Sequence, residues 1–479
     1  MNQLKGKDVS LGLLIGALAL LWGCQAQDLP VSKSSEEQSV NEWIEQTMRL
    51  YYLWEDEIPD SHQLDFNQEA EPFFTSLLTR KDGKTLSDGT HYYYSSINKK
   101  TADAATKSYL GEDYSFGFEF QYYYIPLRKI YALLVLYVLP DSPAALAGIR
   151  RGDWIVAINN RAVSGDTQTL LESLDTTSPV TVSFGFAERK DNFASVSKTC
   201  TLTATKVTDN PVFLHKVIPY GNAKVAYLVY NHFTAGPGET TGDDAFNRTL
   251  REAFRELKGA GADAFVLDLR YNGGGLLSCA QLLATFLAPT SALGDVFCTL
   301  SYNGQTNKYP KQQELMFEVR LAEGENMNLK KLFVITSQRT ASASEAVING
   351  LKPYLNSDLI LVGDTTEGKN VGSLTFEDDN YDWELHPIVS RLSNREGFSD
   401  YSKGFAPDIF YDENHQDNTY AELGDPNEFI LKPILEHIAY GTPIATRSDT
   451  RLRSEEPLER IPIYNSLDRK KTLGVILDR

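Results

Sequence analysis

The sequence predicts a multidomain α+β protein, and three shifts in pattern along the chain indicate this fold class. Residues 42–108 carry apolar side chains at helical spacing, and residues 109–206 are rich in aromatic and aliphatic strand-like runs. Residues 207–440 alternate strand-like runs with amphipathic helical segments, which is typical of βαβ units around a mostly parallel sheet. With 479 residues, 42% of them hydrophobic, the chain can form a sizeable core in each part.

Residues 1–23 are predicted to form a signal peptide. Two lysines precede the apolar run Leu11 to Trp22, which is too short to span a bilayer as a mature helix. Gly23 and Cys24 then resemble a bacterial lipoprotein cleavage site, which implies lipid attachment at the Cys24 thiol. A buried N-terminal helix with an incidental cysteine is the alternative.

This N-terminal pattern also predicts a location and a connection. The lipoprotein resemblance implies a membrane-anchored protein of the bacterial cell envelope, outside the cytoplasm. Residues 24–41 are rich in Ser, Glu and Gln, which predicts a flexible tether between the anchor and the folded part.

The charge and the cysteines limit the partners. The formal net charge is −18, whereas nucleic acids and anionic lipids favour basic surfaces, so nucleic acid is not expected as a partner. Cys279 lies in an apolar helical run and Cys298 in a strand-like one, so buried thiols are expected there. No metal-ligand spacing is found among the cysteines and the seven histidines, and neither a metal nor another cofactor is expected.

The β-rich part contains a segment, Val138 to Gly165, that resembles a PDZ domain. The resemblance is carried by Ser142-Pro143, Ala147-Gly148-Ile149, Gly152-Asp153 and the strand Ile155 to Asn159. It implies that the loop Ser115, Phe116, Gly117 and Phe118 binds a peptide carboxylate and that the adjacent strand edge takes up the peptide as an added strand. A β-domain with glycine turns and no ligand is the alternative.

The part with alternating strands and helices contains a glycine-rich turn. The strand-like run Ala264 to Leu269 leads into the sequence DLRYNGGG, residues 268–275, and a helical run follows from Leu276. Three glycines permit a sharp turn that presents backbone N–H groups to a ligand, although a tight connection needs them equally. The Walker pattern of a phosphate loop is absent.

A second strand-to-helix turn places Ser342 between the strand Lys331 to Thr336 and a helix that reaches Leu351. The next strand, Leu359 to Val362, is followed by Lys369 on a glycine-flanked loop. Two such turns on neighbouring strands can bring a hydroxyl and an amine together for nucleophilic catalysis. By themselves, these residues fit a helix-capping serine and a solvated lysine better than a catalytic pair.

Four motifs together resemble the C-terminal processing peptidases, also called tail-specific proteases. They occur in the family's order behind the PDZ-like segment, at residues 268–275, 340–345, 362–369 and 404–408. The resemblance implies Ser342 as nucleophile, Lys369 as general base, and the N–H groups of Gly274 and Ala343 as the oxyanion hole. The family's Gln at the fourth position after the lysine is Ser373 in this chain.

Two other residues are rival candidates for the chemistry. His232 follows a predicted strand and would serve a histidine-based triad, but a packing or surface role is the favoured interpretation. Ser344 offers another hydroxyl, but a residue two positions further along a helix points away from Ser342.

In the C-terminal extension, residues 441–479, the charged stretch 447–460 is predicted to be solvated, and an ordinary surface extension is the favoured interpretation of the tail. Ile461 to Tyr464 and Leu473 to Ile476 have the character of short docking strands. Docking of this tail in the PDZ-like groove is the alternative.

Taken together, the resemblance implies a helical N-terminal domain (42–108), a PDZ-like domain (109–206) and an α/β serine protease core (207–440). The expected function is that of a serine endopeptidase with a Ser-Lys dyad, which cleaves proteins recognised through accessible C-terminal tails. A peptide-binding lipoprotein on the same scaffold, without catalysis, is the competing hypothesis.

Overall fold

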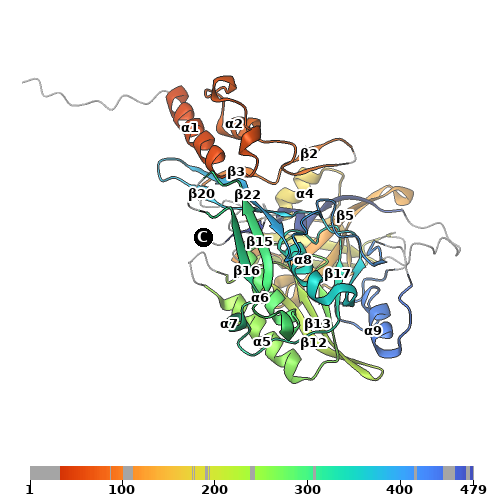
Figure 1. Ribbon diagram of the computed structural model, residues 1–479. Coiled ribbons are helices and arrows are strands. Elements are labelled where there is room, and N and C mark those ends of the chain that lie inside the picture. The colour runs from red at the N-terminus through yellow and green to blue at the C-terminus, as the bar shows by residue number, and fades with distance from the viewer. Residues whose placement is uncertain are drawn as a thin grey trace, which may run out of the picture.

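The computed structural model describes residues 33–477, except for 87, 101–111, 175, 177, 189–192, 194, 238–242, 306–308, 415–417, 446–458 and 471–474. The predicted signal peptide and the lipid attachment at Cys24 lie outside these residues. Figure 1 shows the N-terminal helices α1 (Lys33–Tyr51) and α2 (Ala70–Ser76) at one end of the molecule, with β20 (Phe376–Glu377) and β22 (Ile388–Ser393) beneath them.

A six-stranded sheet forms the centre of the core. Its order is β12 (Val212–Tyr220), β13 (Ala223–Tyr230), β14 (Ala264–Asp268), β17 (Leu332–Thr336), β18 (Leu359–Gly363), β23 (Ile409–Phe410). Only the β12–β13 pair is antiparallel among these neighbours, which confirms the mostly parallel sheet. All the strands and helices predicted around residues 268, 342 and 369 are present.

Helices cover both faces of this sheet. The helices α5 (Ala245–Gly259), α6 (Leu277–Leu287) and α8 (Ala343–Leu355) pack on one face, where Leu267 and Val334 point. The other face, with Val266 and Phe333, packs against α9 (Leu431–Tyr440) and part of the PDZ-like domain. Figure 1 shows α5 and α9 on opposite sides of β12 and β13. Because both faces are covered, the strands are continuous apolar runs.

A five-stranded sheet lies beside α8 and carries the continuation of the lysine loop. Its order is β16 (Gln312–Met316), β15 (Val296–Tyr302), β22 (Ile388–Ser393), β19 (Val371–Ser373), β25 (Val475–Ile476). The short helix α7 (Val319–Ala322) follows β16. The sequence patterns predicted strand character for Cys298 but did not indicate this sheet.

The PDZ-like domain is built on a second large sheet. Its order is β10 (Lys198–Thr203), β9 (Thr181–Ala187), β7 (Trp154–Ile158), β6 (Ile130–Val138), β5 (Phe118–Ile125), β24 (Ile461–Asn465), with β8 (Arg161–Ala162) paired to β7. The helices α3 (Pro143–Leu146) and α4 (Thr167–Leu174) accompany it. Strands β4 (Glu112–Ser115) and β11 (Thr205–Thr208) pair at the two ends of the domain.

The N-terminal domain contains helices, as predicted, but also strands. The helix α1 (Lys33–Tyr51) buries Val40, Ile44 and Met48 at a spacing of four residues, and it packs against α2 (Ala70–Ser76). Since α1 begins at Lys33, the prediction of a tether is wrong for residues 33–41. The strands are β1 (Lys84–Thr85), β2 (His91–Tyr92) and β3 (Ser96–Lys99).

Strand β3 ties this domain to the core. It forms a three-stranded sheet with β21 (Trp383–His386) and β20 (Phe376–Glu377). The backbone of Leu53 also donates to Ile388 O at 2.8 Å. The N-terminal domain therefore shares a β-sheet with the segment that follows Lys369.

The two short docking strands that the sequence predicts in the tail are present. Strand β24 pairs with the PDZ-like domain and β25 pairs with the core, so their backbones complete two sheets. The solvated extension was predicted for residues 447–460, of which 447–458 lie outside the described residues. No helix among the described residues is long and apolar enough to span a bilayer. Cys279 and Cys298 are buried thiols that form no disulfide, and the Cys279 thiol donates to the Asn247 side-chain oxygen at 3.5 Å.

Candidate active site

Ser342 lies in a strained turn at the start of α8. Its φ of 63° and ψ of −115° belong to a region that non-glycine residues rarely occupy. With Glu345 it forms a capping-box arrangement, in which its hydroxyl faces the Glu345 N–H. The Oγ atom is nevertheless buried without a hydrogen bond of normal geometry to any described residue. A buried hydroxyl without a partner costs about 1–3 kcal/mol, so both features mark a position that is not optimised for stability.

The glycine-rich loop packs directly against this serine. Gly274 has a φ of +109°, and a Cβ atom built on it would lie 2.6 Å from the Ser342 Cβ and 2.9 Å from its Oγ. Only glycine fits here. The Gly274 N–H, however, donates to the Asn272 side-chain oxygen at 2.9 Å, while the Asn272 amide donates to Tyr230 O at 2.8 Å. One of the two predicted oxyanion donors is therefore occupied in this structure.

The other predicted donor, Ala343, is the first residue of α8. An N–H group at this position has no partner within its own helix, and it lies at the positive end of the helix dipole. The side-chain hydroxyl of Ser344, one residue further along, donates a hydrogen bond to Asn272 O at 3.1 Å. This bond supports the prediction that the Ser344 hydroxyl points away from Ser342.

One buried carboxylate joins the serine turn to the lysine loop. Glu345 Oε2 accepts the N–H of Ser342 at 2.9 Å and the N–H of Lys369 at 2.8 Å. Its Oε1 accepts the Gly368 N–H at 2.7 Å and the Thr366 hydroxyl at 2.5 Å. Burial raises the pKa of Glu345 to about 7, although these hydrogen bonds lower it. Glu345 thus holds the backbones of both predicted catalytic residues.

Lys369 is buried, with an exposed fraction of 5%. Its Nζ lies 4.6 Å from the centre of the Tyr94 ring, in the N-terminal domain. Since the Ser342 Oγ accepts no hydrogen bond, the two side chains do not form the hydrogen-bonded dyad in this structure. The structure thus brings the backbones of the two residues to one carboxylate, while the Ser342 hydroxyl makes no hydrogen bond.

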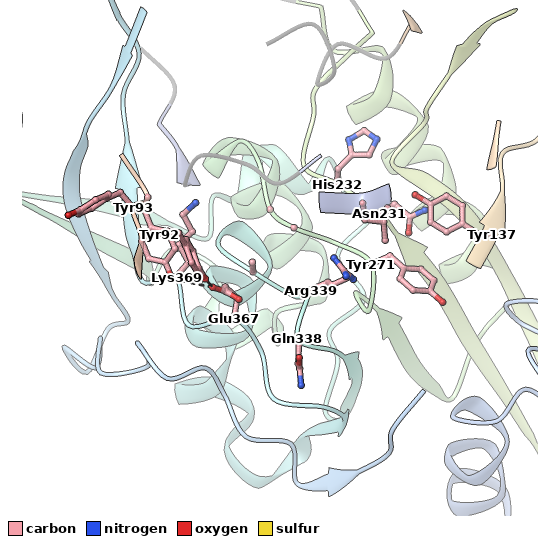
Figure 2. Close-up of a pocket in the computed structure, with 15 residues that line it drawn as sticks. Tyr92, Tyr93, Tyr137, Asn231, His232, Tyr271, Gln338, Arg339, Glu367 and Lys369 are labelled. Carbon is pink, nitrogen blue, oxygen red and sulfur yellow. Dashed lines mark hydrogen bonds between the residues drawn. The ribbon is translucent and has the colours of Figure 1, made fainter. Parts of the chain in front are cut away.

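A cavity of about 230 Å³ lies beside these residues. Gly274, Ala341 and Lys369 contribute to its wall, together with tyrosines from three different parts of the chain. Figure 2 shows Tyr92, Tyr93 and Lys369 on one side of the cavity and His232, Asn231 and Tyr137 on the other. The wall is thus mostly aromatic and apolar, with a few polar groups, as is common for binding sites.

His232 lies in this wall but is engaged elsewhere. Its Nδ1 is 2.9 Å from the Thr234 hydroxyl and its Nε2 is 3.0 Å from Asp209 O. Both ring nitrogens therefore have partners other than Ser342. This geometry agrees with the favoured interpretation of His232 as a packing residue.

A buried ion network fixes the loop that carries the glycines. Arg270 lies 2.8 Å from Glu428 and 3.1 Å from Glu413. Arg151, from the PDZ-like domain, donates to Glu413 at 2.7 Å and to the Tyr271 hydroxyl at 2.5 Å. Burial alone would raise the pKa of Glu413, but the two arginine charges lower it to about 2. The network therefore links the PDZ-like domain to the glycine-rich loop.

The predicted peptide-binding loop is tightly packed. Phe116 and Phe118 are buried in the PDZ-like core. Gly117 has a φ of +85°, and a Cβ atom there would lie 2.0 Å from the Ser142 Cβ. The Gly117 N–H donates to the Ser115 hydroxyl at 2.9 Å. Nothing in these contacts tests the role of the loop in binding, which stays a prediction.

Comparison with known proteins identifies the family. Residues 224–411 match peptidase family S41, residues 39–106 match the peptidase S41 N-terminal domain, and residues 134–184 match a PDZ domain. The crystal structure of a Bacteroides fragilis protein named as an S41 protease is 31% identical and has a TM-score of 0.69, with 84% of this chain and 98% of that chain covered. The chain belongs to peptidase family S41.

Curated relatives of this S41 peptidase carry the name carboxyl-terminal-processing protease. The Picosynechococcus protein is 28% identical over 254 residues, which are 52% of this chain and 53% of that protein. The Synechocystis protein is 27% identical over 323 residues, which are 66% of this chain and 67% of that protein. The chain thus spans between about half and two thirds of the length of these relatives.

The sequence patterns missed several residues of the S41 site. The N-terminal domain was predicted without evident chemistry, yet Tyr92, Tyr93 and Tyr94 line the cavity. Their consecutive aromatic side chains were the available signal. Glu345 was recognised only as a helix cap, because the spacing that creates a capping box does not show what else the carboxylate accepts. Among the described residues, no group of three or more potential ligand side chains is arranged to hold a metal.

Proposed function

We propose that this S41 peptidase is a serine endopeptidase that cleaves proteins recognised through their C-terminal tails. Ser342 is the nucleophile and Lys369 the general base, and the N–H groups of Gly274 and Ala343 stabilise the oxyanion. Family membership supports the peptidase class, and the names of the curated relatives support processing at the carboxyl terminus.

The observation that carries this proposal is the carboxylate of Glu345. It binds the backbone N–H groups of Ser342 and Lys369 at once, so the two residues sit at a fixed separation inside the protein. A structural cap needs only the first of these bonds. The unpaired Ser342 hydroxyl, held in strained backbone beside Gly274, is the second support.

Catalysis from this arrangement requires small rearrangements. The Ser342 hydroxyl has to turn toward the cavity, and the Lys369 amine has to approach it in its neutral form, which a buried setting favours. Lysine then takes the hydroxyl proton while Oγ attacks the substrate carbonyl, and it passes this proton to the peptide nitrogen as the C–N bond breaks and the amine product leaves. The resulting acyl-enzyme is hydrolysed by water. Asn272 has to release the Gly274 N–H before that group can bind the oxyanion.

We also propose that the protein is lipid-anchored at Cys24 and faces away from the cytoplasm, in the bacterial cell envelope. The support is the sequence of residues 1–24. Metabolic labelling with a radioactive fatty acid tests it, because a Cys24→Ser variant should lose both the label and the membrane association. Label on both proteins, or on neither, would contradict it.

A second candidate function is peptide binding without catalysis. It is favoured by the Ser342 hydroxyl, which makes no hydrogen bond, and by the occupied Gly274 N–H. It predicts tight binding of C-terminal peptides by a protein that cleaves nothing.

One assay separates the two functions. The soluble protein lacking residues 1–24 is incubated with an unfolded protein that bears either a free or an amidated C-terminus. Cleavage by the wild type but not by Ser342→Ala or Lys369→Ala supports the dyad, and we expect each variant to lose at least about 10³-fold in kcat/KM. Preference for the free terminus supports tail recognition. Equal cleavage by wild type and variants would refute the assigned roles.

A further inference from the structure

The C-terminal tail of the chain occupies the edge of the PDZ-like sheet where a peptide would add. Strand β5 has β6 on one side and β24 on the other. In the antiparallel register, Ile461 pairs with Tyr124 and Asn465 with Gln121, so β24 runs toward Gly117 and the predicted carboxylate loop. This is the direction in which a peptide inserts its C-terminus into such a groove.

The contacts of β24 are buried and specific. Asn465 donates to the Gln121 side chain at 2.7 Å, and the Gln121 amide donates to Tyr464 O at 2.8 Å. Ser466 is completely buried, accepts the Phe120 N–H at 2.7 Å and contacts the Glu119 carboxylate. A loosely placed surface extension would not satisfy these buried polar groups.

The same tail then reaches the catalytic core. Leu467 lines the cavity that contains Lys369, and Asp468 pairs with Arg339 in its wall. Strand β25 pairs in parallel with β19, which begins two residues after Lys369. Leu477 donates its N–H to Ser373 O at 3.1 Å and packs in the hydrophobic core.

We propose that residues 459–470 and 475–477 act as an intramolecular peptide ligand that holds the peptidase in a resting state. This inference rests on the proposed function, because it takes the edges of β5 and β19 as the places where substrate binds. In this structure β24 and β25 occupy these two edges. A substrate that pairs with β5 or β19 has to displace the tail first. The unassembled dyad and the occupied Gly274 N–H are what a resting state requires.

Covalent linkage makes this competition effective. A segment attached to its own binding site acts at an effective concentration that reaches the millimolar range, so even weak strand pairing resists a dilute substrate. The apparent affinity for substrate falls in proportion to the fraction of molecules with a free edge. If the tail is docked in nine of ten molecules, its release raises kcat/KM about tenfold.

Leu477→Asp tests the proposal with little risk to the fold. The change puts a charge into the core only when β25 is docked, and it lies at the last residue that the structure describes. Val319→Asp is the matched control, because Val319 is 62% exposed and outside the tail and the site. With an unfolded protein as substrate, we expect Leu477→Asp to raise kcat/KM about tenfold and Val319→Asp to leave it unchanged.

A binding measurement separates this inference from the proposed function. A fluorescent peptide with the sequence of residues 459–477 is titrated into the Ser342→Ala protein with and without Leu477→Asp. Tighter binding to the Leu477→Asp protein, with faster cleavage in the active background, supports the inference. Tighter binding without any cleavage supports the internal ligand and refutes the proposed function. Normal cleavage, with no gain in binding or rate, overturns the inference and leaves the proposed function standing.

Discussion

The serine half and the lysine half of the candidate site are built in different ways. Ser342 is positioned by its own strand and helix and by the glycine-rich loop next to it, and these segments directly follow strands of the central sheet. Lys369 is surrounded by segments from distant parts of the chain. Its amine faces Tyr94 of the N-terminal domain, and the strand that follows it pairs with the C-terminal tail.

This difference teaches where the site is rigid and where it is adjustable. The serine half depends on buried backbone bonds and on glycines that leave no free space. The lysine half depends on contacts between domains and on a short edge strand. Breaking such contacts costs less free energy than breaking the buried backbone hydrogen bonds of the serine half. We infer that any assembly of the dyad proceeds mainly through movement on the lysine side.

The largest effect on activity is expected from Gly274→Ala, which disturbs the position of Ser342. The added Cβ meets Ser342 and also strains a positive φ, so we expect kcat/KM to fall by at least about 10²-fold. Gly294→Ala is the control, because Gly294 has a φ of +90° but a Cβ atom added there would meet no other atom within 4 Å. Equal losses for both variants would show that strain, not contact with Ser342, causes the effect.

Glu345→Gln tests the link between the halves. The amide nitrogen replaces one carboxylate oxygen, so two of the four donors lose their acceptor, at about 1–3 kcal/mol each. We expect a lower thermal midpoint and a loss in kcat/KM of roughly 10–100-fold. The exposed Glu396→Gln serves as control. Unchanged kcat/KM for Glu345→Gln would contradict the linking role.

Glu413→Gln tests the network under the serine half through its pH dependence. The pKa of Glu413 is lowered from 4.5 to about 2, so its charge stabilises the fold above pH 4.5, and this contribution disappears as the pH falls toward 2. The wild type should exceed the variant by on the order of 3 kcal/mol at pH 7. Thermal midpoints from pH 7 to pH 3 check this. A gap that stays constant over this range would refute it.

The smallest effect is expected from Tyr94→Leu in the lysine half. Loss of the aromatic ring removes a cation–π contact that stabilises the charged Lys369 amine by about 1 kcal/mol, so we expect the neutral base to form at lower pH and kcat/KM to rise by up to about fivefold on the acidic side of its pH profile. Tyr94→Phe keeps the ring and should retain nearly full activity, which separates this contact from the hydroxyl. The pH profile of kcat/KM should shift for Leu but not for Phe. Identical profiles for the two variants would argue against the contact.

Much of the core was predictable because its signals are local. The runs around residues 268, 336 and 362 are continuous and apolar, and they form β14, β17 and β18 as predicted. The turn at Ser342 followed from a strand next to a helical pattern. Secondary structure of this kind is determined by neighbouring residues, so it can be predicted without information about the rest of the chain.

The lysine half was less predictable because its partners are distant in sequence. Nothing in residues 91–94 points to Lys369, and the docking strands predicted in the tail did not show which two sheets β24 and β25 would join. Strand pairing of this kind depends on which edges remain open after folding. A short apolar run in the sequence does not show which strand edge it will pair with.

The sequence alone determined the order of domains, the two strand-to-helix turns and the residues expected to carry the chemistry. Only the tertiary structure decided that Glu345 joins the two turns and that the Ser342 hydroxyl is buried without a hydrogen bond. It also decided that the chain's own tail fills the strand edges beside them. The physical reason is that local patterns specify elements, whereas buried hydrogen bonds between elements form only where packing brings their donors and acceptors together.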